Sequence, residues 1–141
     1  MIRAVVTGLM SAYTTWKTAN PTKALAKVTG FYFMRAPQGV TGDYVTFQLL
    51  PGGKPDPDMS ANVEVIPVQL DIWVEDKSAR HNMNLGLELA EQITDIYDDA
   101  TISVTGGTCY RCDRQNKPNI LADPDSGWHV WVEYILQVQE G

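Results

Sequence analysis

Cys109 and Cys112 form a Cys-Tyr-Arg-Cys pattern, the spacing found in thiol redox enzymes and in half of a zinc site. A redox pattern of this kind places its first cysteine at a helix N-terminus, where the dipole lowers the thiol pKa. Here the pattern ends an expected strand, Thr101–Arg111, and a charged loop follows it. A zinc site needs further ligands, and the two histidines, His81 and His129, stand at no recognisable spacing from the pair. We interpret the cysteines as thiols at a strand end, with a small thiol-dependent or metal-binding enzyme as the alternative.

Two short acidic clusters, Asp56–Asp58 and Asp123–Asp125, contain the oxygen ligands that calcium prefers. A calcium loop of EF-hand type counted from Asp123 needs an oxygen ligand at position 5 and glycine at position 6, but these are Gly127 and Trp128. We expect both clusters to lie in solvent-exposed loops. The chain also has no serine-centred elbow, no glycine-rich phosphate loop and no HExxH pattern. We therefore expect no enzyme activity, no cofactor and no metal.

The composition is that of an ordinary globular protein. A length of 141 residues predicts a single domain, residues 1–141, and the hydrophobic content of 44% with 20% charged residues argues against disorder. No apolar run approaches the ~18 residues of a membrane span. Polar residues interrupt the apolar N-terminal stretch, so we expect no secretion and free thiols in a reducing compartment. The net charge of −6 disfavours a reader of nucleic acids, whose phosphate contacts need clustered basic residues.

A long strand that passes almost directly into a helix lies at the centre of the sequence. Asn62–Val74 alternates apolar residues, but their parity changes at Ile66-Pro67, which suggests an edge strand or a β-bulge. Ser78 is placed to cap the helix that follows. The apolar residues of this helix recur at helical spacing: Leu85, Leu89, Ile93, Ile96 and Tyr97. We expect Leu89 and Ile93 to be buried against the sheet.

The other elements follow from the same periodicities. We expect a helix at residues 2–18 and strands within 23–35, 43–50, 101–111 and 127–138. Pro51–Asn62 and Asp113–Gly127 are expected to be long polar loops. The predicted order α-β-β-β-α-β-β, with few helical crossovers, indicates an α+β fold in which an antiparallel or mixed β-sheet carries two helices.

Several large side chains point away from the main apolar face of their strands. We expect one face of the sheet to carry Trp73, His129, Trp131 and Ile135. If the helices cover the other face, these residues form an exposed contact surface for subunits; otherwise the N-terminal helix covers them. The long loops supply a second set of candidate assembly residues: Lys54, Asp56, Asp58, Arg114 and Lys117.

The order of elements resembles the tail-terminator, or tail-completion, proteins of long-tailed bacteriophages. The similar pieces are the N-terminal helix, DYVTFQLLPGG (Asp43–Gly53), VIPVQLDIWVED (Val65–Asp76), MNLGLELAEQITDIY (Met83–Tyr97) and GWHVWVEYILQV (Gly127–Val138). Together they cover roughly two-thirds of the chain. The Cys-x-x-Cys pattern and the length of the Asp113–Gly127 segment are not features of that family.

The resemblance implies a structural protein of the virion rather than an enzyme. Such proteins form a homo-oligomeric ring, commonly a hexamer, that ends the tail-tube protein and joins the tail to the head–tail connector protein. DNA passes through the lumen without specific binding, and an acidic lumen would repel its phosphates. The protein would reside at the head-proximal end of the tail, and in the host cytoplasm during assembly. A ring needs two complementary patches on each subunit. The alternatives of the same class are a head-side connector and a tail-tube subunit.

Overall fold

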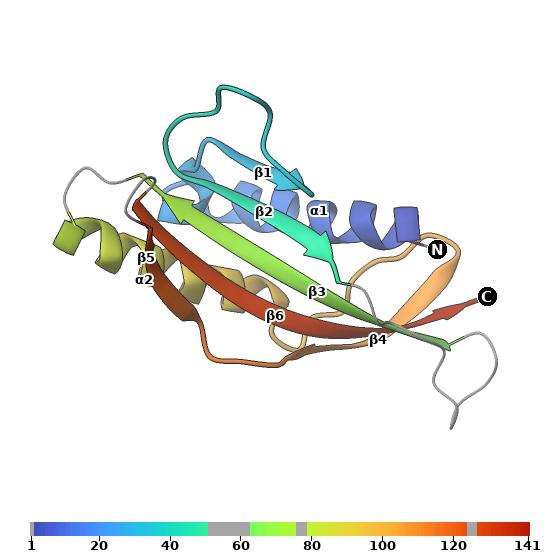
Figure 1. The fold of residues 1–141 in the computed structure, drawn as a ribbon. Coiled ribbons are helices and arrows are strands. Elements are labelled where there is room, and N and C mark those ends of the chain that lie inside the picture. The colour runs from blue at the N-terminus through green and yellow to red at the C-terminus, as the bar shows by residue number, and fades with distance from the viewer. Residues whose placement is uncertain (1, 51–62, 76–78, 124–126) are drawn as a thin grey trace.

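The computed structural model describes residues 2–50, 63–75, 79–123 and 127–141. Its elements confirm the predicted α+β class (Figure 1). In chain order they are α1 (Ile2–Ala19), the short 3-10 helix η1 (Ala24–Lys27), β1 (Gly30–Phe33), β2 (Tyr44–Leu49), β3 (Val63–Val74), α2 (Ala79–Tyr97), β4 (Gly107–Arg114), β5 (Asn119–Asp123) and β6 (Gly127–Glu140). No helix in the described part of the chain is long and apolar enough to cross a membrane.

The strands form one mixed sheet in the order β1-β2-β3-β6-β4, with β5 also paired to β6. Only β1 and β2 run parallel; the remaining pairs are antiparallel. The 14 residues of β6 pair with β3 along one edge and with β5 and then β4 along the other. This long strand therefore connects both halves of the sheet.

Both helices lie on the same face of the sheet (Figure 1). Leu89 and Ile93 of α2 are buried there, as predicted, and Tyr97 packs against Tyr134 of β6. On α1, Tyr13 stacks on Phe31 of β1, with ring centroids 4.3 Å apart. Strand register places Phe31, Val45, Ile72 and Val130 in line across the sheet, so α1 and α2 cover one continuous apolar face.

The edge strand or β-bulge expected at Ile66-Pro67 was wrong, because β3 lies inside the sheet between β2 and β6. The β3–β6 register continues through Pro67 without a shift. Pro67 lies where β2 ends: its carbonyl accepts a hydrogen bond from the Leu50 amide (2.9 Å), and proline has no N–H to return. The parity change reflects two apolar faces, because Val63, on the face away from the helices, is also buried.

The predicted loop Asp113–Gly127 was also wrong, because it contains β5 and the end of β4. The strand expected at Thr101–Arg111 begins only at Gly107. A polar segment with Pro118 and Pro124 at its borders gave no strand signal, yet β5 pairs with β6 from Asn119 to Asp123. Pairing to a long neighbour therefore overrides the weak local preference. The predicted cap Ser78 and the loop Pro51–Asn62 lie outside the described residues.

Candidate functional site

The face of the sheet away from the helices carries a line of rings that we call the aromatic row: Tyr32, Tyr44, Trp73, His129 and Trp131. Register places Tyr44, Trp73 and His129 directly opposite one another on β2, β3 and β6. The Trp73 and His129 rings are parallel within 6°, with centroids 4.0 Å apart. Tyr44 stacks on Trp73 at 6.4 Å, Trp131 lies 5.2 Å from His129, and Tyr32 extends the row at 6.3 Å from Tyr44. The row thus crosses four strands.

A polar network beneath these rings fixes their orientation. Asp71 is only 6% exposed, and its Oδ1 lies 2.7 Å from Nε2 of His129 and accepts a hydrogen bond from Gln69 at 2.8 Å. The Trp73 indole donates to the Thr46 hydroxyl at 3.2 Å. A buried carboxylate without partners is costly, and here it is paired. The aromatic row is consequently a pre-organised surface rather than a set of mobile side chains.

The structure brings together the four residues predicted for a contact surface. Trp73, His129 and Trp131 belong to the aromatic row, and Ile135 lies further along β6 on the same face, opposite Pro67 of β3. All four side chains are partly buried. Both described helices lie on the other face, so the alternative in which the N-terminal helix covers these residues is wrong. Their use as an interface between subunits stays a prediction.

The five predicted loop residues do not gather at this face. Lys54, Asp56 and Asp58 lie outside the described residues. Arg114 is the last residue of β4 rather than part of a loop, and its guanidinium pairs with Asp98 just beyond α2 at 3.3 Å. Lys117 is exposed between β4 and β5.

The two cysteines are buried in the core and do not end a strand. In a regular strand, residues three apart point to opposite faces. A register shift between Cys109 and Arg111 turns both thiols toward the helices, leaving them 4% and 1% exposed. Burial raises the pKa of Cys109, and burial together with the neighbouring Cys109 and Asp113 raises the pKa of Cys112 to about 12. A reactive or metal-bound cysteine must be a thiolate, so this environment opposes both uses.

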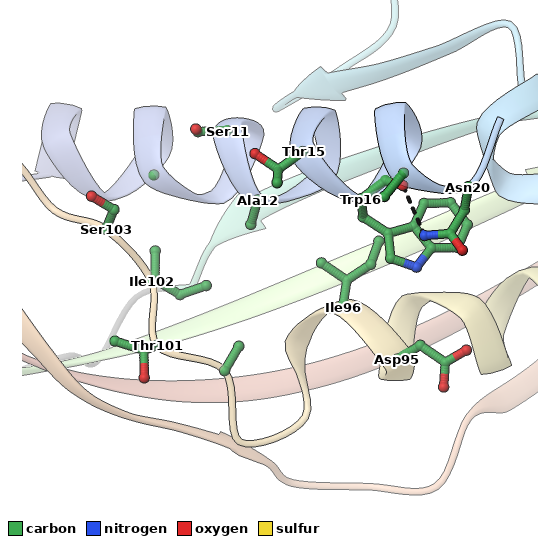
Figure 2. A pocket seen from close by; sticks show the side chains of 13 residues that line it. Ser11, Ala12, Thr15, Trp16, Asn20, Asp95, Ile96, Thr101, Ile102 and Ser103 are labelled. Carbon is green, nitrogen blue, oxygen red and sulfur yellow. Dashed lines mark hydrogen bonds between the residues drawn. The ribbon is translucent and has the colours of Figure 1, made fainter.

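No group of three histidine, cysteine or acidic residues in the described ranges is close enough to hold a metal ion. A groove of about 400 Å³ lies between α1 and the segment that follows α2 (Figure 2). Trp16, Ile96 and Ile102 line it with several small residues, and Asp95 is its one titratable lining residue. An activated nucleophile needs a hydroxyl hydrogen-bonded to its base, and in the described part of the chain no hydrogen bond joins Asp95 to a hydroxyl of the lining. The groove has no recognisable catalytic set.

Sequence reasoning missed five members of the site: Tyr32, Tyr44, Thr46, Gln69 and Asp71. Tyr44 lies in an expected strand, but only strand order and register decide that it meets Trp73. Asp71 lies two residues before Trp73 on β3, so strand alternation places both on the same face. Its pairing with His129 depends on the β3–β6 register.

No protein-family model matches the chain, and no curated protein matches it. Solved structures do share its fold. A chain of the virion of a native gene transfer agent particle matches 97% of this chain and 98% of its own length, with a TM-score of 0.66 and 16% identity. A second solved chain, 12% identical with a TM-score of 0.57, matches 100% of this chain and 97% of its own. At these identities the likeness shows a common fold.

Proposed function

We propose that this protein is a structural subunit of a phage-like virion, which ends the tail tube as a closed ring and joins the tail to the head. The observation that carries the proposal is the sheet face with the pre-organised aromatic row, which no helix in the described part of the chain covers. Aromatic residues are enriched in the cores of protein interfaces, and a rigid surface loses little entropy on binding. The fold shared with a gene transfer agent virion chain, almost end to end, supports a place in a virion.

In this role each subunit contacts a neighbouring copy through the aromatic row and Ile135. A ring commonly of six subunits then contacts the tail-tube protein on one side and the head–tail connector protein on the other. DNA passes through the lumen without specific binding, which agrees with the net charge of −6. Assembly takes place in the host cytoplasm, and the finished ring stays at the head-proximal end of the tail.

Electron microscopy of the purified protein separates this role from its alternatives in the same class. A terminator forms closed rings that do not grow, whereas a tail-tube subunit polymerises into tubes. A head-side connector forms rings that bind isolated heads rather than the ends of tail tubes. The enzyme alternative, based on Cys109 and Cys112, is opposed by the burial and raised pKa values of both thiols.

The decisive variant is Trp131→Ala, with Trp128→Ala as its control on the same strand. Trp131 points to the uncovered face, whereas Trp128 packs against the core. Loss of a central interface tryptophan typically costs ~2 kcal/mol or more, or roughly 30-fold in affinity. We expect Trp131→Ala to keep its fold and to lose ring formation and the yield of joined particles, whereas Trp128→Ala lowers the melting temperature. If Trp131→Ala assembles with unchanged affinity, the interface is not at the aromatic row.

A further inference from the structure

Opposite charges are concentrated on different parts of this protein. Residues 2–42, which form α1, η1 and β1, contain no acidic residue but five exposed basic residues: Arg3, Lys17, Lys23, Lys27 and Arg35. Residues 83–110, which include most of α2, contain no basic residue but five acidic ones: Glu88, Glu91, Asp95, Asp98 and Asp99. A protein of mixed charge has no need of such segregation for folding alone.

The two charged regions touch inside the subunit, because the Tyr97 hydroxyl of α2 donates a hydrogen bond to the Leu9 carbonyl of α1 and the Leu25 amide of η1 donates one to Gln92 of α2. Their outer sides differ in position. α1 packs on β1 at one edge, whereas α2 packs on β3 and β6 (Figure 1). Ala12 and Trp16 of α1 line the groove that faces α2 (Figure 2), and Arg3 is rotated from Ala12 by roughly 180° around the helix axis. Arg3 therefore points away from α2. Arg35 follows directly after β1, the edge strand of the sheet.

Several of these charges oppose the helix dipoles. Arg3 lies in the first turn of α1, which has no acidic residue, although a helix N-terminus favours negative charge. Asp95 lies in the last turn of α2, which has no basic residue, although a C-terminus favours positive charge. Neither residue forms an ion pair with any other described residue. Helix stability therefore does not explain these charges.

We propose that the flank carrying Arg3 and Arg35, here called the basic flank, binds the exposed face of α2 with Glu91 and Asp95, the acidic face, of a second copy of this chain. A contact between two different patches of the same chain is a head-to-tail contact, the type that closes a ring. The basic flank borders the uncovered sheet face, because β1 carries both Tyr32 and the connection to Arg35. The proposal rests on the ring function and names the surface of the neighbouring copy that completes the contact.

The groove beside Asp95 can accommodate a long basic side chain of the second copy. The Trp16 ring is already in contact with Lys23 of the same chain, whose Nζ lies 5.9 Å from the ring centroid. Ile96 and Ile102 can cover the aliphatic part of an arginine, and Asp95, which also lines the groove, can meet its guanidinium. Such a contact combines apolar burial with charge pairing. It would make Asp95 more sensitive to substitution than Glu91.

The test is a pair of charge reversals in the full chain, Arg3→Glu with Arg35→Glu and Glu91→Lys with Asp95→Lys. The reversals at Arg3 and Asp95 improve the match to the helix dipoles, so both variants should fold. Each variant alone should self-associate roughly 30-fold more weakly in sedimentation velocity, since two ion pairs become repulsive. Mixed together, the two variants should recover assembly as alternating rings, because each reversed patch then faces its complement. Higher salt should weaken association of the parent protein.

Glu75→Lys with Glu140→Lys is the control, because it gives the same change in net charge as Glu91→Lys with Asp95→Lys at two exposed sites outside α2. This control should associate like the parent protein. If the parent forms rings and either reversal leaves them intact, or if mixing restores nothing, the proposed contact is wrong and the ring function stands. A parent chain that remains monomeric at every attainable concentration and on isolated tail tubes overturns the ring function itself.

Discussion

Gly8 of α1 should not tolerate alanine, although alanine is the better helix former. A Cβ built at Gly8 would lie 2.3 Å from the carbonyl oxygen of Ser103 and 2.9 Å from Cγ2 of Ile102. The substitution gains about 1 kcal/mol of helix propensity. Overpacking against a fixed backbone atom costs about 1–3 kcal/mol and sometimes more. Because the 2.3 Å contact is with a backbone atom, the upper end of this range applies, and we expect the free energy of unfolding to fall by about 2 kcal/mol in Gly8→Ala.

Gly86 of α2 is the matched control, since it also lies in a helix that faces the core. Its Cβ would meet Cγ2 of Val130 at 3.1 Å, the end of a side chain that can yield. We expect Gly86→Ala to change stability by less than about 1 kcal/mol, because propensity offsets the tight contact. Urea unfolding measures the change in the free energy of unfolding for both variants. In thermal unfolding, a loss of 1 kcal/mol should lower the melting temperature by about 2–4 °C. If Gly8→Ala is as stable as the parent, α1 does not pack on this segment, and its position on the covered face is in doubt.

Two further predictions concern the core. Leu89→Ala should cost about 2–5 kcal/mol in urea unfolding, because Leu89 is 1% exposed against the sheet; a parent-like transition would show that this face of α2 is wrongly assigned. Burial raises the pKa of both thiols in the folded state, to about 12 for Cys112. The thiols are therefore protonated in the native protein and ionise more readily when it unfolds. Their contribution to stability is complete below the unfolded pKa and should disappear as pH rises toward 12, so Cys112→Ala should flatten the alkaline decline in melting temperature while assembly is retained. An identical alkaline profile in parent and variant would refute the burial of Cys112.

The long elements of the fold could be predicted because their periodicity is sustained over many residues. α2 repeats its apolar positions over several turns, and β6 alternates from Trp128 to Val138, so the burial of Leu89 and the direction of Trp131 followed from the sequence. These patterns are local, and they record which face of an element meets the core.

The errors arose where a partner strand, rather than local sequence, decides the structure. The five residues of β5 have little alternation, and β6 provides the pairing that makes them a strand. The bulge near Cys109 cannot be predicted from Cys-Tyr-Arg-Cys, which in a regular strand would send the two thiols to opposite faces. Pro67 is the opposite case, because the change of parity predicts an edge strand or a bulge where β3 lies inside the sheet and its backbone continues in register. The aromatic row required the same missing information, namely the register between β2, β3 and β6.

The side chains of the sheet face that carries the aromatic row explain how this face can stay exposed without non-specific association. A purely aliphatic face of this extent would favour non-specific association. Here the polar side chains of Thr46, Gln69 and Asp71 lie among the rings. Their hydrogen bonds, including the one between Asp71 and His129, are formed within the subunit. Because these polar groups need no partner, a neighbouring copy gains the contact area of the rings without first breaking the network. Because the rings are already held in place, little side-chain entropy is lost on binding. Such a surface favours a specific contact over general adhesion, as the proposed role in a ring requires.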